Sequence, residues 1–162
     1  MTYSIKKLKE VNPQLMEELR VYTYKVVGCC QLVHKELGAF LNEYIYQDAL
    51  KIIFDEHQIP NNKEYYFGIM FHNQLIRHKH YVDFRCFDDV FVECKAVEHL
   101  CSEHRQQLWN YMRLTKTKLG VLYNFAPPRD QCERYYLDLL NPVKWYSFAR
   151  NKYAAHKLFE NT

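Results

Sequence analysis

The sequence predicts an α/β fold in which a central mixed β-sheet is flanked by helices. An apolar side chain recurs every three or four positions from Leu15 to Leu37, which is the period of a helix with one buried face. Farther along, two β-branched and aromatic segments, 90–97 and 119–124, enclose a polar segment with helical character. A strand, helix, strand order of this kind usually forms a right-handed crossover that covers a sheet.

The first helix is predicted to start at Asn12-Pro13, where an N-cap residue precedes a proline, and to end at Gly38. A second helix is expected from about residue 41 to residue 57, before Pro60 and a turn at Asn61-Asn62. The complete order is α-α-β-β-β-α-β-β-α. The later elements are predicted as strands over 65–71, 75–87 (long or interrupted) and 90–97, a helix over 101–115, strands over 119–124 and 132–139, and a helix over 143–158.

Length and composition indicate a single globular domain over residues 1–162. Of these residues 48% are hydrophobic, and no repeat or linker divides them. The formal net charge of +3 permits a polyanionic partner without requiring one. No apolar run approaches the roughly 20 residues that cross a bilayer, and the N-terminus lacks a secretory signal. We therefore expect a cytoplasmic protein with no membrane partner.

The six cysteines are scattered and form no C-x-x-C pair, so neither a disulfide framework nor a zinc ribbon is predicted. An iron–sulfur cluster held by four of these cysteines is an alternative that their spacing allows. Scattered cysteines, however, are more often small buried hydrophobic residues. A reducing compartment fits this composition best.

Three charged residues fall on the predicted strands. Asp83 precedes Glu93 by ten positions, and Lys95 follows Glu93 by two. Side chains two positions apart on a strand share a face, and burying charges there is costly unless another group compensates. Two acids and a lysine on the inner side of a sheet can hold a divalent cation beside a water molecule. The alternative is that Glu93 and Lys95 lie on the solvated face of an edge strand.

The two acids can meet in only one strand register. For Asp83 to lie opposite Glu93, the turn must contain an odd number of residues, such as Phe87-Asp88-Asp89, or the hairpin must contain a bulge. A two-residue turn at Asp88-Asp89 would place Asp83 opposite Cys94 and turn the acids to different faces. The Cys94 side chain should point away from the acids and pack as core.

Several segments, taken in order, resemble the GxxExxY proteins of the PD-(D/E)XK nuclease superfamily. They are the helical segments 24–38 and 43–50, the hairpin segments 81–84 and 92–97, the helical segment 104–111 and the strand 119–125. The resemblance covers about residues 20–136 and implies a restriction-endonuclease-like fold.

The sequence departs from the family at two positions. Phe40 stands where the motif opens with glycine, although Glu43 and Tyr46 are kept, so the loop between the first two helices is expected to differ in shape. The Pro-Asp pair of the superfamily is reduced to Val82-Asp83, which keeps the acid.

The resemblance implies a ligand set and a catalytic lysine. Asp83 and Glu93 would bind Mg²⁺ or Mn²⁺, and the backbone carbonyl of Cys94 would complete the set. Lys95 would orient or deprotonate the attacking water and steady charge at the phosphate. Glu43 would hold the metal through water or bind a second ion, its alternative being a solvated helix acid.

Further residues are expected to serve the site and its substrate. Gln107 and Tyr111 lie i and i+4 on one helix face and resemble the Q-x-x-x-Y element of RecB-like nucleases, which implies that they help to place the metal or the substrate strand. The alternative for Gln107 is ordinary helix surface. Tyr46 is assigned to substrate binding with Tyr111, and its alternative is helix packing.

A basic run precedes the Asp83 strand. Arg77, His78, Lys79 and His80 are expected, together with Arg85, to meet phosphates, and a solvated strand end is the alternative. Zinc is a rival hypothesis, with His78 and His80 or His99 and His104 as ligands, but these pairs lack a persuasive zinc spacing.

The C-terminal segment mixes basic and aromatic residues. We expect it to form an amphipathic helix docked on the sheet, with a grip on single-stranded nucleic acid as the less favoured alternative. The residues concerned are Lys144, Trp145, Tyr146, Phe148, Arg150, Lys152, Tyr153 and Lys157.

These observations predict a divalent-metal-dependent phosphodiesterase, a nuclease that acts on DNA through metal-assisted attack of water. The alternative is a catalytically silent nucleic-acid-binding or assembly module that keeps the nuclease-like fold. Cleavage of RNA or of a nucleotide is not separated from cleavage of DNA. A homodimer is an option that the architecture allows, although the sequence carries no interface signature.

Overall fold

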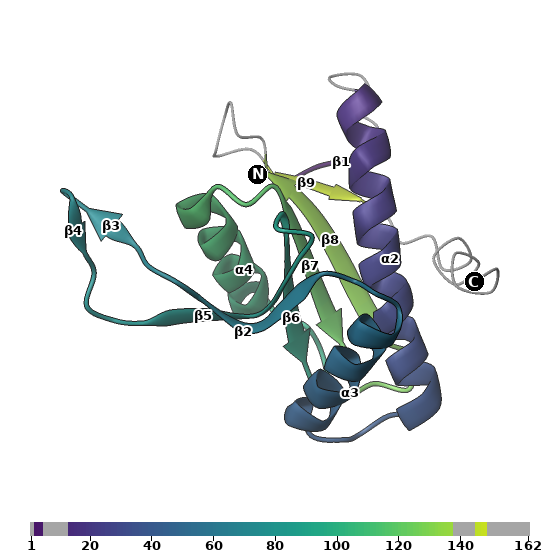
Figure 1. Cartoon of the computed structure of the whole chain (residues 1–162). Coiled ribbons are helices and arrows are strands. Elements are labelled where there is room, and N and C mark those ends of the chain that lie inside the picture. The colour runs from purple at the N-terminus through teal and green to yellow at the C-terminus, as the bar shows by residue number, and fades with distance from the viewer. Residues whose placement is uncertain (1, 5–12, 138–144, 149–162) are drawn as a thin grey trace.

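The computed structural model describes residues 2–4, 13–137 and 145–148, with side chains over 20–137. A seven-stranded mixed sheet of order β1-β9-β8-β7-β6-β5-β2 forms its centre, and β3 and β4 form a separate small sheet (Figure 1). The predicted α/β fold, with two helices before the main strands, is confirmed. The strands are β1 Thr2–Ser4, β2 Asn61–Phe67, β3 Met70–Phe71, β4 Gln74–Leu75, β5 His80–Cys86, β6 Val90–Lys95, β7 Leu119–Asn124, β8 Gln131–Leu137 and β9 Trp145–Phe148.

Two helices cover one face of the sheet. Helix α2 spans Pro13–Leu37 and is followed by Gly38, whose φ of 77° suits a residue without a Cβ. Helix α3 spans Glu43–Glu56. Their buried side chains pack in one cluster with inward-facing residues of the central strands, for example Val26 and Leu50 with Val92. In α2 the predicted apolar positions Val26, Cys30 and Val33 are buried, although Leu37 at the end of the helix is 40% exposed. In α3 the buried face consists of Tyr46, Leu50 and Phe54, whereas Ile52, which its apolar pattern places inward, is 58% exposed.

Helix α4, Ser102–Thr115, covers the opposite face. Leu108 and Met112 pack in a second cluster with Phe91 of β6 and Leu122 of β7, whereas the neighbouring Val92 belongs to the first cluster. Because alternate side chains enter opposite clusters, β6 is buried on both faces. β6 and β7 are parallel neighbours joined through α4, so the prediction of an interior Glu93 strand is confirmed.

The β5–β6 hairpin has the register that brings the two acids together. Phe84 lies opposite Val92, and the turn consists of the three residues 87–89. Phe87 and Asp88 in this turn have positive φ angles of 53° and 59°. The odd-numbered turn is therefore present, and the two-residue turn at Asp88-Asp89 is not.

The β2–β5 region differs from the prediction. Asn61 and Asn62 do not form a turn, because both pair with β5 as the first residues of β2. The predicted strand 65–71 is split at Gly68, after which β3 and β4 form a short hairpin. Figure 1 shows that residues 68–79, here called the arm, extend away from the body of the protein between β2 and β5.

The C-terminal prediction of a helix over 143–158 is wrong for the part that the structure describes. Residues 145–148 form strand β9, which pairs antiparallel with β8 and parallel with β1. The aromatic residues of this segment suit a strand, and pairing satisfies backbone groups at the edge of β8. Residues 143, 144 and 149–158, which carry the basic side chains of the predicted helix, lie outside the described residues. Within the described residues, no helix combines the length and apolar character needed to cross a membrane.

Candidate functional site

The candidate site lies where the β5–β6 hairpin holds Asp83 opposite Glu93. The Asp83 carboxylate oxygen Oδ2 accepts a hydrogen bond of 2.7 Å from the backbone N–H of Cys94. The Asp83 side chain on β5 thus binds the backbone of β6 just beyond Phe84 and Val92, the last residues that pair between the two strands. This bond fixes the Asp83 carboxylate at the end of β6.

Glu93 and Lys95 share one side of β6. Glu93 is only 3% exposed, so the alternative of a solvated strand edge does not hold for it. Lys95 Nζ lies 3.9 Å from Glu93 Oε2, a long ion pair, while Glu93 Oε1 is buried and accepts no hydrogen bond from the described residues. An unpaired buried polar atom costs about 1–3 kcal/mol. The site therefore contains a buried acceptor oxygen that no described side chain or amide pairs with.

The charge of Asp83 opposes ionisation of Glu93. Burial raises the pKa of Asp83, and the Cys94 amide and the Lys95 ammonium lower it. Burial and the charge of Asp83 together hold the pKa of Glu93 well above its usual range, although Lys95 acts in the opposite direction. One lysine compensates incompletely for two buried carboxylates, and such a pair favours a further positive charge.

Glu43 reaches the same place from α3. It is the first residue of the helix, directly after the N-cap Asn42. Burial raises its pKa, Lys95 lowers it, Asp83 raises it and a hydrogen bond from the Ala96 amide lowers it. The groups that act on Glu43 belong to the hairpin, so the structure brings together the predicted residues Glu43, Asp83, Glu93 and Lys95.

The carboxylates fit a hard divalent cation that keeps several waters. Mg²⁺ is often bound through one or two carboxylates, and Asp83 and Glu93 offer such a pair with one oxygen unpaired. Among the described residues, no group of three His, Cys, Asp or Glu side chains is arranged to hold a metal ion. Glu43 therefore does not complete a three-residue ligand set in this arrangement. Neither do the predicted histidine pairs.

Comparison with known proteins agrees with this architecture. The profile of the PD-(D/E)XK nuclease superfamily matches residues 20–135. The chain belongs to this superfamily. No curated protein matches the chain. A solved structure titled "Crystal structure of SSO0001" resembles it with a TM-score of 0.46 and 15% identity; the match covers 74% of this chain and 56% of that chain, so the present chain spans little more than half of that protein.

Two further residues lie near Asp83 and Glu93 in this superfamily member: the buried Cys94 and the acidic Glu64. The Cys94 thiol is fully buried in the cluster beneath α2 and α3, as predicted, and burial raises its pKa well above the usual value. Glu64, which sequence reasoning missed, lies on β2 between residues that pair on either side of Asp83, and its charge also raises the pKa of Asp83. Glu64 has a φ of 52°, so strand alternation could not have placed it.

Gln107 and Tyr111 share one face of α4, as predicted. The Gln107 amide donates a hydrogen bond of 3.1 Å to the Tyr111 hydroxyl. The Tyr111 ring packs edge-on against Phe67 and His80, whose rings stack on each other. The pair therefore fixes the base of the arm to α4, at the strand that carries Asp83.

The structure gives Tyr46 a packing position instead of the predicted place at the substrate. Tyr46 is fully buried and its ring stacks on Phe125. Its hydroxyl donates to the Gly38 carbonyl at 2.7 Å and accepts from the Leu41 amide at 3.1 Å. With its ring enclosed and its hydroxyl engaged, Tyr46 shapes the loop between α2 and α3 and has no free surface for a substrate.

The predicted phosphate contacts divide into two groups. Arg77, His78 and Lys79 are exposed on the arm, and His80 is half-buried at its base. Arg85 lies toward the other end of β5, where its guanidinium donates to the Asp88 carbonyl and faces the Tyr65 ring. Arg85 is thus not brought together with the run on the arm.

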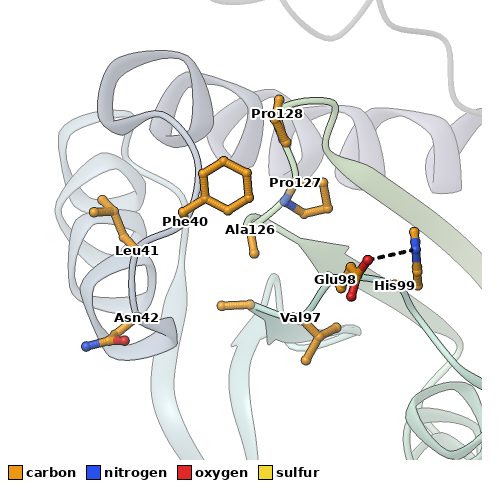
Figure 2. Close-up of a pocket in the computed structure, with 10 residues that line it drawn as sticks. Phe40, Leu41, Asn42, Val97, Glu98, His99, Ala126, Pro127 and Pro128 are labelled. Carbon is orange, nitrogen blue, oxygen red and sulfur yellow. Dashed lines mark ion pairs between the residues drawn. The ribbon is translucent and has the colours of Figure 1, made fainter.

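A pocket that sequence reasoning missed opens beside the acids. It has a volume of about 640 Å³ and lies between the loop 38–42, the segment after β6 and the segment after β7 (Figure 2). Phe40 stands on its rim, 77% exposed, with a φ of 65°. A non-glycine residue in this left-handed region costs about 1–2 kcal/mol. The departure from glycine at this position was visible in the sequence, but the pocket depends on three segments far apart in the chain.

Proposed function

We propose that this member of the PD-(D/E)XK superfamily is a divalent-metal-dependent nuclease that hydrolyses DNA. The observation that carries the proposal is the buried Asp83 and Glu93 pair, with Lys95 beside it and one Glu93 oxygen unpaired. A stable fold gains nothing from two buried acids with raised pKa values. A site that binds a cation, in contrast, benefits from two such acids.

Asp83 and Glu93 would hold Mg²⁺ or Mn²⁺, together with the backbone carbonyl of Cys94 and solvent. Glu43 lies close enough to respond to Lys95 and Asp83 and would act through water or at a second ion. When bound, the cation supplies positive charge to the phosphate and lowers the pKa of a coordinated water. The same charge would relieve the repulsion between the two acids.

Lys95 would orient the attacking water in line with the bond that breaks and would stabilise charge on the phosphate oxygens. An ammonium suits this task because it is a compact charge with three donors. Its neighbours support this role: Glu93 lies at 3.9 Å, and the side chain is 16% exposed, so it is both oriented and accessible. Gln107 and Tyr111 would place the substrate strand from α4.

The arm supports a nucleic acid as the substrate. No acidic residue occurs from 65 to 82, whereas Arg77 and Lys79 carry positive charge. Basic residues on a projecting hairpin can contact phosphates without reading sequence. We further propose that, within the superfamily, the chain is of the GxxExxY type, because Glu43 and Tyr46 keep the Glu and Tyr of that motif.

One observation favours the alternative of a silent binding module. The described residues contain no ready-made group of three metal-ligating side chains. A module of this kind would bind nucleic acid without taking up Mg²⁺ or Mn²⁺. Titration calorimetry with each metal separates the two functions, because only the nuclease should release heat that disappears on Glu93→Gln substitution.

Cleavage assays test the nuclease directly. Supercoiled DNA, linear duplex, single-stranded DNA and RNA are incubated with purified protein and either Mg²⁺ or Mn²⁺. Asp83→Asn and Lys95→Ala should each lower the rate at least about 100-fold, as loss of a charge-stabilising group does in other enzymes. Asp88→Asn is the matched control, since Asp88 lies in the turn of the same hairpin with an 89% exposed side chain, and it should retain activity. Equal rates for the wild type and Asp83→Asn on every substrate would refute the proposal.

A further inference from the structure

From the pocket beside the acids we infer that the protein holds an unpaired nucleobase of its substrate, stacked on Phe40, next to the phosphate that is cleaved. The inference rests on the proposed function and names the form of nucleic acid that the site accepts. The pocket is lined by Phe40, Leu41, Asn42, Ala96, Val97, Glu98, His99, Ala126, Pro127 and Pro128. Figure 2 shows the Phe40 ring beside Ala126 and Pro127 on one side of the pocket, with Val97 across from it.

The pocket adjoins the catalytic residues through two chain neighbours. Asn42 immediately precedes Glu43, and Ala96 immediately follows Lys95. The Ala96 backbone lowers the pKa of Glu43, so the two walls approach each other at the site. A strand whose phosphate lies at Lys95 would therefore have an adjacent nucleotide within reach of the pocket.

The Phe40 conformation is strained, and the fold gains little from the ring. Phe40 has a φ of 65°, yet 77% of the residue is exposed, so burial of the ring offsets little of the strain. Its backbone N–H donates to the Ala126 carbonyl at 3.0 Å, which holds the conformation in place. Glycine would adopt the same backbone without a Cβ penalty. Strain of this kind is common at ligand sites, and an aromatic ring on a pocket rim is a stacking surface.

Polar side chains fix all three walls of the pocket. Tyr46 binds both Gly38 and Leu41, which determines the shape of the loop that carries Phe40. Asn124, fully buried, accepts from the Val97 amide and donates to the Val97 carbonyl.

The third wall is held by α2. The His34 ring nitrogen Nε2 lies 2.8 Å from the Pro127 carbonyl. A pocket whose walls are fixed in this way is formed before its ligand arrives, which lowers the entropic cost of binding.

An unpaired base fits the chemistry of the pocket better than a base pair. The walls are mainly apolar and offer an aromatic face, and both faces of a base within a duplex are already covered by its neighbours. A base in a single strand, a flap or a frayed end exposes its faces and can stack on an aromatic side chain. Glu98 Oε1 and His99 Nε2, 3.6 Å apart, provide polar groups at the pocket edge.

The test uses the full chain carrying Asp83→Asn, so that binding is read without cleavage. Fluorescent single-stranded oligonucleotides and blunt duplexes are titrated against this protein and against its Phe40→Gly variant. Stacking on an aromatic side chain corresponds to about 5- to 150-fold in affinity. Phe40→Gly should weaken single-strand binding by this factor, leave duplex binding within twofold, and raise the melting temperature because the backbone strain is relieved.

Gln58→Gly is the matched control. Gln58 is exposed, uncharged and also left-handed, with a φ of 55°, but it lies in the loop after α3 and does not line the pocket. This variant should gain stability in the same way and keep its single-strand affinity.

An oligonucleotide series with one abasic position locates the stacked base. At one position of the series, the abasic site should weaken binding to the Phe40-containing protein as much as Phe40→Gly does. The same abasic site should cause no further loss of affinity in the Phe40→Gly variant. Undetectable single-strand binding, equal affinities of Phe40→Gly and its parent, or equal losses for single strand and duplex would overturn the inference. Failure of the nuclease proposal would look different, because hydrolysis would be absent from the otherwise unmutated chain while Phe40-dependent binding remained.

Discussion

Replacing Glu93 by glutamine should stabilise the metal-free protein at neutral pH. Glu93 is 3% exposed, its Oε1 atom has no hydrogen-bond partner among the described residues, and the nearby Asp83 repels its charge. Glutamine has nearly the same shape, carries no charge and can donate a hydrogen bond to the Asp83 carboxylate. The substitution thus removes the least compensated charge of the site without opening a cavity.

The size of the effect follows from the burial of this one carboxylate. Giving the unpaired buried polar group a hydrogen-bond partner returns about 1–3 kcal/mol, which for a chain of this length corresponds to a melting-temperature increase of roughly 2–10 °C. Because the folded-state pKa of Glu93 is raised, the folded protein binds this proton more tightly than the unfolded chain does. Stability is then greatest below the ordinary pKa of 4.5 and decreases as the pH rises toward the folded-state pKa. The advantage of Glu93→Gln should therefore be present at pH 7 and vanish near pH 4.

Thermal and urea unfolding, followed by circular dichroism in EDTA at pH 4 and pH 7, measure this difference. A saturating divalent cation should reverse it, since a ligand at 100 times its dissociation constant adds about 2.7 kcal/mol to the wild type and less to the variant. Glu133→Gln is the control, because Glu133 accepts a hydrogen bond of 2.8 Å from Arg105 and its loss should leave stability equal or lower. A Glu93→Gln variant that is less stable than the wild type at pH 7 in EDTA would refute the reasoning.

Three further variants test other parts of the structure. Gly120→Ala would bring its Cβ against Met112 Sδ and to 3.1 Å from Leu108 Cδ2, so unfolding experiments should show a loss of about 1–3 kcal/mol, and an unchanged stability would contradict the close packing of α4 on β7. Tyr46→Phe leaves the Leu41 amide and the Gly38 carbonyl without their partner; hydrogen exchange of the Leu41 amide should accelerate, and unchanged exchange would mean that Tyr46 does not hold the loop. Replacing both Arg77 and Lys79 by alanine should reduce the slope of log affinity for DNA against log salt by about 1.8 if each contacts one phosphate, whereas Lys51→Ala, on α3, should leave the slope unchanged.

The hairpin at the centre of the site could be predicted because strand periodicity and turn length determine it together. Once the turn has three residues, Asp83 must face Glu93, and Glu93 must share a side with Lys95. The interior position of β6 followed from the parallel partner across α4. These relations are local or nearly local in the chain, so the sequence contains them.

The differences arise where distant contacts decide the structure. Residues 145–148 have an aromatic pattern compatible with a helix or a strand, and pairing with β8 makes them a strand. Tyr46 was assigned by its motif, but its hydroxyl is engaged by the loop that ends α2. The pocket at Phe40 requires three segments that lie up to about 90 positions apart. Its one sign in the sequence is Phe40 at the position where the family motif has glycine. Pairings of that kind depend on tertiary structure and not on local pattern.

Diffraction from crystals grown with Mn²⁺, recorded at a wavelength where manganese scatters anomalously, tests the central claim most directly. We expect an anomalous peak within coordination distance of the Asp83 and Glu93 carboxylates, and loss of that peak in the Glu93→Gln variant. An absence of anomalous density there at saturating Mn²⁺, with the two acids still side by side, would contradict it.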